Sequence, residues 1–266
     1  MDALGRGRMQ LDRIGLYWRV FATGLSFVSF GIGGIVLRVL VFPLLNLLVW
    51  QRQQRTKFAR GIIRFTFRSF VGLMRALGVL RYEIIGGHRL ERSGLLILAN
   101  HPTLIDTVFL MAFVKRADCI VKAGLWNNPF TRGPVRAAGY INNDQGADLI
   151  ADCIASLASG NNLIIFPEGT RTPSSGVISL KRGAANIAAR GRYNMTPVVI
   201  SCVPMTLGKG EKWWRVPARF AQFRIEVKED IEIDQFIAHG ASEVMAARHI
   251  NEYLEHYFIE GKKQHA

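Results

Sequence analysis

The 266-residue sequence predicts an α/β fold, a largely parallel sheet flanked by helices, preceded by an N-terminal membrane-associated helical hairpin. Two observations predict it. From about residue 81, short β-prone runs alternate with helical stretches, as in parallel sheets with crossover helices. Before that point, residues 20–51 carry a single charge, Arg38. We therefore divide the chain into an N-terminal membrane anchor with a basic amphipathic helix, residues 1–80, and an α/β domain, residues 81–266.

The apolar segment consists of two runs, 20–37 and 39–50, with basic residues on both sides. Because basic flanks remain on the cytoplasmic side of a membrane, both ends are expected on that side, which one straight span cannot satisfy. Two full spans need roughly 40 apolar residues, more than the segment offers. We expect a shallow hairpin that bends at Arg38 and Pro43, enters one leaflet and returns, with Arg38 reaching the headgroups. A single tilted span and a buried soluble hairpin are the alternatives.

Residues 51–80 keep helical periodicity, with apolar and basic residues on different faces. The apolar stripe comprises Phe58, Ile62, Phe65 and Leu73, and the basic face comprises Lys57, Arg60, Arg64 and Arg68. Such a helix is typical of an anionic membrane surface, although a solvated basic face is the plainer alternative.

The charge of the chain is uneven. Residues 1–92 hold 15 Lys+Arg against 4 Asp+Glu, whereas the remainder holds 19 against 16. Since no nucleic-acid-reading motif accompanies this excess, we expect no nucleic-acid partner. Membrane lipids are the expected partners.

The three cysteines, Cys119, Cys153 and Cys202, are odd in number, far apart and embedded in apolar runs. This pattern predicts neither a disulfide framework nor a metal site. We expect no metal and no resident cofactor, and a domain that faces the reducing cytosol.

The α/β domain is expected to alternate strands with helices. Strands are predicted over 82–85, 95–99, 119–122, 163–166, 197–203 and 223–227, and helices over 103–114, 147–159, 181–192 and 241–257. Ligands bind beyond the carboxyl ends of parallel strands. His101 and Glu168 each fall just past such an end.

The string NHPTLID, residues 100–106, supplies a candidate base and carboxylate. Pro102 suits the first turn of a helix, which puts His101 at the helix cap and Asp106 about one turn inside. The ring can then fold back onto the carboxylate, which fixes its tautomer and favours the imidazolium. A capping histidine with an unrelated aspartate is the alternative, because an isolated His/Asp pair is weak evidence.

The string FPEGTRT, residues 166–172, follows a second predicted strand. A tight turn at Gly169 presents Glu168, Thr170 and Arg171 at the same sheet edge as the first string. Arg171 is a natural phosphate partner because its planar fork donates two parallel hydrogen bonds. A plain β-turn with a surface salt bridge is the alternative.

Together these strings resemble the glycerolipid acyltransferase family, whose best-known members are lysophosphatidic acid acyltransferases. His101 and Asp106 match the family's His-x4-Asp motif, and residues 166–172 match its FPEGTRS-like motif. A block that begins at Lys122 has the family's lysine, proline and glycine spacing. The similarity covers roughly residues 85–205.

The resemblance implies a membrane-bound O-acyltransferase that moves a fatty acyl group from acyl-CoA or acyl carrier protein to a lysophospholipid such as lysophosphatidic acid. His101 would be the general base and Asp106 its orienting partner. The implied substrate-binding residues are Glu168, Gly169, Thr170, Arg171 and Lys122. The implied location is a membrane, the inner one if the source is bacterial, with the active site facing the cytoplasm. Acyl carrier protein is then a candidate partner.

Two further features bear on the reaction. The chain has no G-x-S-x-G elbow and its cysteines have no evident base, so direct transfer without an acyl-enzyme is expected. Residues 140–148, YINNDQGAD, lack the arginine that many glycerophosphate-using members carry there. The same chemistry on a non-glycerophosphate acceptor, a lyso-aminolipid or a specialised polyene lipid, is therefore an alternative. A non-catalytic basic membrane-binding module is another, but it leaves both motifs unexplained.

Overall fold

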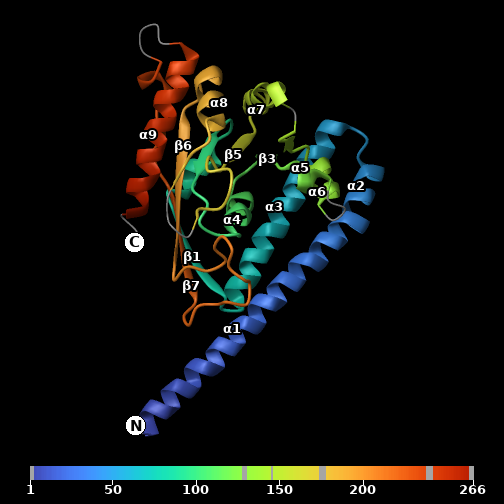
Figure 1. Ribbon diagram of the computed structural model, residues 1–266. Helices are drawn as coiled ribbons and strands as arrows, with labels where there is room; N and C mark the ends of the chain where they lie inside the picture. The colour runs from blue at the N-terminus through green and yellow to red at the C-terminus, as the bar shows by residue number, and fades with distance from the viewer. Residues whose placement is uncertain (1–2, 128–130, 145, 174–177, 238–241, 264–266) are drawn as a thin grey trace.

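The computed structural model describes residues 3–127, 131–144, 146–173, 178–237 and 242–263. A seven-stranded sheet forms its centre, and helices cover both faces (Figure 1). The strands are β1 (Leu80–Ile85), β2 (Leu96–Ala99), β3 (Ala117–Val121), β4 (Ile141–Asn142), β5 (Asn162–Ile165), β6 (Met195–Val203) and β7 (Ala221–Val227). The α-helices are α1 (Ala3–Val36), α2 (Phe42–Leu48), α3 (Arg52–Ala76), α4 (Asp106–Phe113), α5 (Ala123–Asn127), α6 (Arg132–Ala137), α7 (Leu149–Ala158), α8 (Gly183–Gly191) and α9 (Glu243–Lys263).

The sheet order is β1-β7-β6-β2-β5-β3-β4. Every neighbouring pair is parallel except β6 and β7, which run antiparallel. This confirms the predicted α/β class and all six predicted strands. The sequence missed β4, because a strand of two residues is too short to show an alternating pattern.

Strand β2 shows why the central strands read as continuous apolar runs. Leu96 and Leu98 pack on one face of the sheet with α7, α8 and α9, while Ile97 and Ala99 pack on the other with α3 and α4. Such burial on both faces is typical of parallel sheets. The core thus holds the carboxyl end of β2 firmly, where NHPTLID begins.

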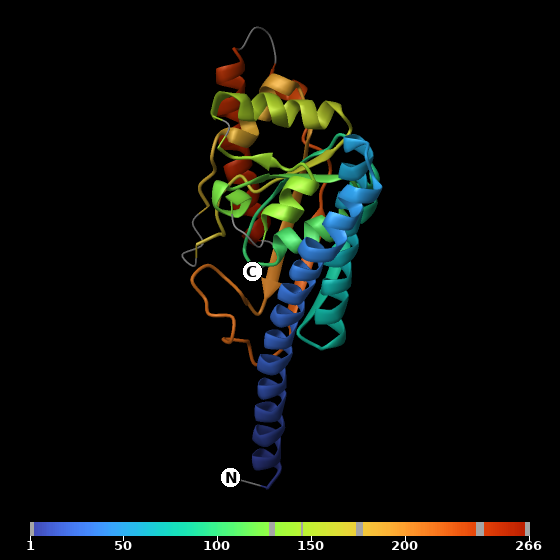
Figure 2. The same cartoon turned by 90° about the vertical axis from the view of Figure 1, so that its right-hand side faces the viewer.

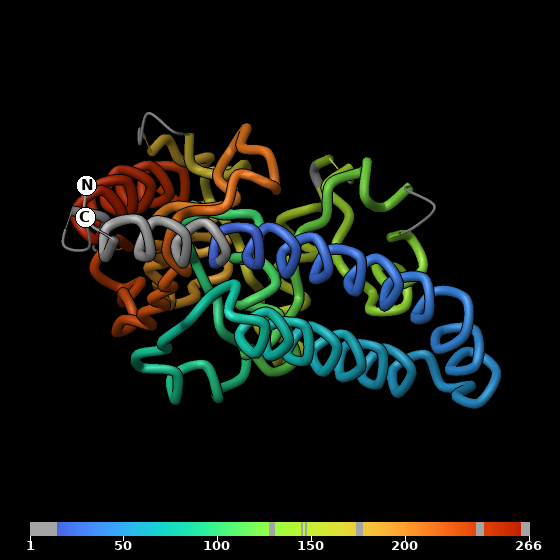
Figure 3. The backbone as a smooth tube through the Cα atoms, turned by 90° about the horizontal axis from the view of Figure 1, so that it is seen from below, coloured from blue at the N-terminus to red at the C-terminus, as the bar shows by residue number. Residues whose placement is uncertain are grey.

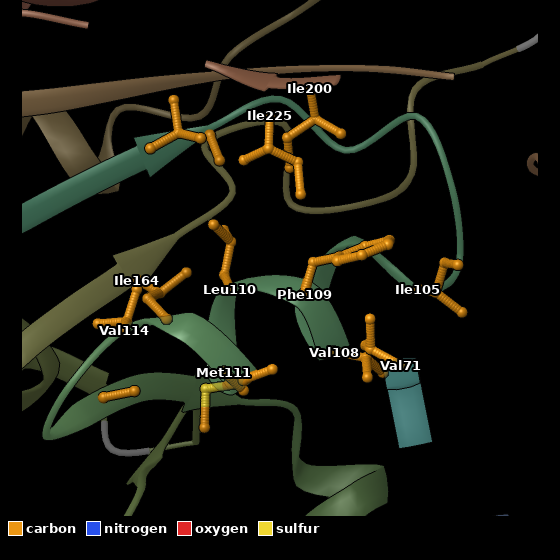
Figure 4. Packing of buried hydrophobic residues seen from close by; sticks show 14 of the residues in the cluster. Val71, Ile105, Val108, Phe109, Leu110, Met111, Val114, Ile164, Ile200 and Ile225 are labelled. Atoms are coloured by element: carbon orange, nitrogen blue, oxygen red, sulfur yellow. The ribbon is translucent and has the colours of Figure 1, made fainter. Parts of the chain in front are cut away.

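Helix α4 fills the space between the sheet and α3. Figure 4 shows Phe109 and Leu110 directed toward Ile200 and Ile225 of the sheet, with Val71 of α3 beside Val108. Phe109 is fully buried. This packing fixes α4, and with it Asp106 at the first position of the helix.

The N-terminal hairpin exists, but its arms differ from those predicted. Helix α1 continues through a π-helical segment, Leu37–Val41, into α2, and the chain reverses only at residues 49–51. Helix α3 then runs back beside α1 (Figures 2 and 3). The predicted reversal at Arg38 and Pro43 is therefore wrong. Pro43 lies in the first turn of α2, where a missing N–H is tolerated, so the helix continues there.

Candidate active site

The loop after β2 is pinned to β6 by Asn100. Its amide nitrogen donates to the carbonyl of Ile200 at 2.8 Å, and its amide oxygen accepts from the N–H of Ile200 at 2.7 Å. Because Asn100 is buried, this two-way pairing leaves little freedom to the residue that follows. His101 therefore starts from a fixed backbone position.

The predicted contact between His101 and Asp106 is present. Nδ1 of His101 lies 2.9 Å from Oδ2 of Asp106, and the carboxylate also accepts from Thr103, at 2.6 Å from its N–H and 2.5 Å from its hydroxyl. Burial raises the pKa of the fully buried Asp106 carboxyl, and the hydrogen bonds from His101 and Thr103 oppose that rise.

The helix boundary at this site differs from the predicted one. Helix α4 begins at Asp106, so Pro102 lies in the loop before the helix; the turn that leads into the helix is at residues 104–105. The N–H of Leu104 donates to the carbonyl of Leu207 at 3.0 Å, which holds this turn outside the helix. The side chain of Asp106 thus reaches backward from the helix start to Thr103 and His101.

The ring of His101 also stacks on Phe166, with centroids 4.2 Å apart. Because Nδ1 is directed at the Asp106 carboxylate, Nε2 is the ring nitrogen on the opposite side. The side chain of His101 is 15% exposed. The ring is therefore held on two sides while part of it stays exposed.

FPEGTRT is joined to His101 through the backbone. Oε1 of Glu168 accepts from the N–H of His101 at 3.0 Å and from the hydroxyl of Thr172 at 2.8 Å. The N–H of Thr172 donates to the carbonyl of His101 at 2.7 Å. The two motifs thus form one unit, in which the buried Glu168 positions the histidine.

Gly169 and Thr170 form the exposed part of the second motif. Gly169 has a φ of +66°, and a Cβ there would lie 2.9 Å from Cε of Lys181. The left-handed backbone favours glycine, so this residue shapes the turn. Thr170 is exposed at the same turn.

Arg171 holds the loop between β6 and β7, residues 204–220. One terminal nitrogen, Nη1, donates to the carbonyls of Leu207 at 3.1 Å and Gly208 at 2.8 Å. The same loop contacts α1, because Nε of Arg19 donates to the carbonyl of Pro217 at 3.2 Å. Arg171 therefore links the site to the N-terminal arm, and only part of its guanidinium remains for a ligand.

Lys122 follows β3 at the same sheet edge, with β5 between β3 and β2. Its side chain is exposed and makes no hydrogen bond or ion pair with the other described site residues. The structure thus brings His101, Asp106, Glu168 and Arg171 together, and leaves Lys122 at the margin.

The three cysteines lie in or beside the apolar core. All three are free, and burial raises the pKa of Cys153 and of Cys202 to about 12. Thiols in this state are poor nucleophiles. Among the described residues no group of His, Cys, Asp and Glu could hold a metal ion.

Comparisons with known proteins find similarity to acyltransferases. A family model described as Acyltransferase matches residues 81–201, which include both motifs. The 1-acyl-sn-glycerol-3-phosphate acyltransferase of Saccharomyces cerevisiae is 27% identical over 146 residues, which are 51% of this chain and 48% of that protein. The enzyme of that name from Pseudomonas aeruginosa is 25% identical over 148 residues, 52% of this chain and 56% of that protein.

Residues 81–201 thus resemble the acyltransferase family, and the matched relatives are named 1-acyl-sn-glycerol-3-phosphate acyltransferases. The matched region spans about half the length of these relatives. The crystal structure of the 1-acyl-sn-glycerophosphate (LPA) acyltransferase, PlsC, from Thermotoga maritima has the same fold. The two structures superpose with a TM-score of 0.66 and 19% sequence identity. The alignment covers 95% of this chain and 98% of the PlsC chain.

Sequence reasoning missed three residues of this candidate site. Thr103 holds Asp106, Asn100 pins the loop and Thr172 joins the two motifs. The spacing of Thr103 and Asp106, three apart at a helix start, is that of a capping box and could have identified the pair. The cross-strand partner of Asn100 has no such local signal, because it is 100 residues away.

Proposed function

We propose that this chain is a membrane-bound O-acyltransferase that moves a fatty acyl group from an acyl thioester to the hydroxyl of a lysophospholipid such as lysophosphatidic acid. The single observation that supports this most is the His101–Asp106 pair, held at 2.9 Å with the ring partly exposed. The donor is acyl-CoA or acylated acyl carrier protein, and no resident cofactor takes part.

The reaction needs no covalent enzyme intermediate. Nε2 of His101 takes the proton of the acceptor hydroxyl as its oxygen bonds to the thioester carbonyl carbon. Collapse of the tetrahedral intermediate breaks the carbon–sulfur bond, and the departing thiolate receives the proton from the imidazolium. Asp106 keeps the ring in the required tautomer and stabilises its positive form.

Arg171 and Lys122 are the basic groups that we assign to the acceptor phosphate. The ends of β5 and β3 place both at the edge that carries His101. Gly169 and Thr170 shape the intervening turn. Because Arg171 also holds the 204–220 loop, its acceptor contact depends on nitrogens other than Nη1.

The acceptor is open to a second candidate. Strand β4, Ile141–Asn142, and the residues up to 148 contain no arginine. In enzymes that use glycerophosphates, an arginine in this region would contact the acceptor phosphate. Its absence here favours the same transfer to a non-glycerophosphate acceptor, such as a lyso-aminolipid. Assaying both acceptor classes with one thioester distinguishes the two.

Membrane attachment is proposed for the N-terminal arm. Residues 15–48 form a helical segment long and apolar enough to cross a membrane by length and composition, and only 6% of its most apolar window is buried. Its exposed side chains include Val39 at 68% and Leu47 at 70%, and Trp50, which follows the segment, is 88% exposed. The basic flanks favour the cytoplasmic side for the active site.

The experiment that tests the function measures thiol release by the purified chain from acyl-CoA with lysophosphatidic acid as acceptor. His101→Ala should reduce transfer by about 10²- to 10⁴-fold, the usual contribution of a general base. The exposed His88, in a different segment, provides the matched control His88→Ala. Equal transfer by the two variants contradicts the base assignment.

A separate experiment tests attachment. Replacing Leu47 and Trp50 with aspartate should release the chain from sedimenting vesicles, because charge on the exposed apolar arm opposes burial in lipid. Undiminished sedimentation of this double variant contradicts the anchor.

A further inference from the structure

A cavity of about 810 Å³ lies between α3 and the sheet, away from His101. Its walls include the first half of α3, residues 115–117 at the start of β3, and Asn161 just before β5. His101 and Lys122 follow the opposite ends of the parallel strands. A strand of four residues spans roughly 13 Å, so the cavity is separate from the candidate active site.

The cavity is strongly basic. Six of its lining residues carry positive charge, and none of its described lining residues is acidic; the six are Arg52, Lys57, Arg60, Arg64, Lys115 and Arg116. So many like charges around one space repel one another unless an anion lies among them.

Only part of this charge is balanced by the protein. Arg60 pairs with the buried Asp118 at 2.7 Å, and Lys115 lies 4.0 Å from the exposed Glu91. In the part of the chain that the structure describes, Arg52, Lys57 and Arg64 form no ion pair.

Two lining residues have polar atoms without a partner. Nε of Arg64 and the hydroxyl of Tyr140 are buried and make no hydrogen bond to any described group. Such atoms are uncommon in folded proteins and call for a ligand or water.

Backbone strain accompanies this polar wall. Arg116 has a φ of +49°, a left-handed conformation that side chains other than glycine rarely adopt. Its guanidinium donates to the carbonyl of Ser159, on the loop before β5. Strained residues concentrate at functional sites, where the surrounding structure holds them.

We propose that this cavity binds a multiply charged phosphate group and that the bound anion joins α3 to the α/β domain. Arginine forks match phosphate oxygens in pairs, and lysine adds point charge. The volume suits a small ligand. The group can belong to an anionic lipid headgroup or to a soluble phosphate ester, since both present the same oxygens. The proposal does not depend on acyl transfer.

The test variant removes three cavity charges while keeping the Arg60–Asp118 pair. It combines Lys57→Gln, Lys115→Gln and Arg116→Gly. Glycine suits the left-handed backbone at position 116, so this change relieves strain.

The control variant removes three charges outside the cavity. It combines Arg55→Gln and Arg68→Gln on α3 with Arg192→Gly. Arg192 is exposed and has a φ of +52°, so its replacement relieves the same kind of strain as that of Arg116. The two variants thus have equal net charge and differ in where the charge is lost.

Calorimetric titration of the full chain, in neutral detergent at fixed ionic strength, uses inorganic pyrophosphate as the probe. Wild type should bind, the test variant should bind at least about tenfold more weakly, and the control should differ from wild type by less than about twofold. Equal weakening in both variants, or no binding by wild type, overturns the proposal.

Vesicles of phosphatidylcholine, with and without phosphatidic acid, distinguish the source of the phosphate. If the test variant loses more of the phosphatidic-acid-dependent binding than the control does, the site takes a lipid headgroup. If both variants lose the same amount of phosphatidic-acid-dependent binding, but only the test variant binds pyrophosphate more weakly, the site takes a soluble phosphate. Acyl transfer measured on the same samples shows separately whether the proposed function holds.

Discussion

The carboxylate of Asp106 is fully buried and lies 2.9 Å from Nδ1 of His101. In the proposed mechanism, this contact keeps the ring proton on Nδ1 and leaves Nε2 as the base. The carboxylate is therefore needed for its charge as well as its shape. An amide at the same position could present its NH₂ group to Nδ1 and favour the wrong tautomer.

Asp106→Asn should lower kcat for thiol release by roughly 10²- to 10⁴-fold, because the histidine loses the partner that makes it a base. Steady-state kinetics with saturating acceptor measures this. Asp234→Asn, at an exposed position in a different segment, is the control. An unchanged kcat in Asp106→Asn contradicts the role of the pair.

Thr103 should act as a positioning residue through Asp106. Its hydroxyl opposes the rise in the pKa of the buried Asp106 carboxyl, so Thr103→Val should raise that pKa further. In the proposed mechanism activity needs the carboxylate form, so it should fall as pH drops through this pKa. The acid limb of the kcat/KM profile should therefore move to higher pH.

The conservative change Thr103→Ser keeps the hydroxyl, so the acid limb of its kcat/KM profile should lie at the wild-type pH. Thr103→Val should also cost about 1–3 kcal/mol of unfolding free energy, because it leaves a buried acceptor unsatisfied. A valine variant with lower stability but the wild-type pH profile would show a structural role alone.

The sequence predicted the central parts of this architecture well and the connections poorly. Runs such as 95–99 are apolar throughout because both faces of β2 are buried, so their pattern is strong. The His101–Asp106 contact was predictable because it is local. The position of the hairpin reversal was not predictable, because Arg38 and Pro43 lie within one continuous helical arm that passes from α1 through a π-helical segment into α2.

The contact of Glu168 with the backbone of His101 also lay beyond the sequence. The position of Glu168 after β5 correctly predicted that it lies at the sheet edge that carries His101. Its assignment to acceptor binding was based on the motif. The structure shows Oε1 turned to the backbone of His101, 67 residues earlier. Pairings of this kind depend on the order of β2 and β5 in the sheet, which no local pattern specifies.

Glu168 provides a prediction of its own. Glu168→Gln keeps an amide oxygen for the N–H of His101 and the hydroxyl of Thr172, so the fold should be retained. Glu168→Ala removes both acceptor contacts and should lower the unfolding free energy by about 1–3 kcal/mol. Denaturant titration of the two variants compares them, and equal stability contradicts the positioning role.

The buried thiols yield a prediction about pH. An unfolded cysteine ionises near pH 8.5, whereas the pKa of folded Cys153 and of folded Cys202 is about 12. Protonated thiols are thus favoured in the fold. Their contribution to stability is present below pH 8.5 and is lost as pH rises toward 12.

At pH 8.5 the thiolate fraction of these two folded cysteines is therefore about 10³-fold below that of unfolded chain, and alkylation should slow in proportion. Mass spectrometry after iodoacetamide treatment measures this, with guanidinium-denatured chain as the control. The native chain should keep both thiols unmodified and retain its transfer activity. Rapid native labelling of Cys202, accompanied by loss of activity, would instead support a reactive thiol and a covalent acyl intermediate.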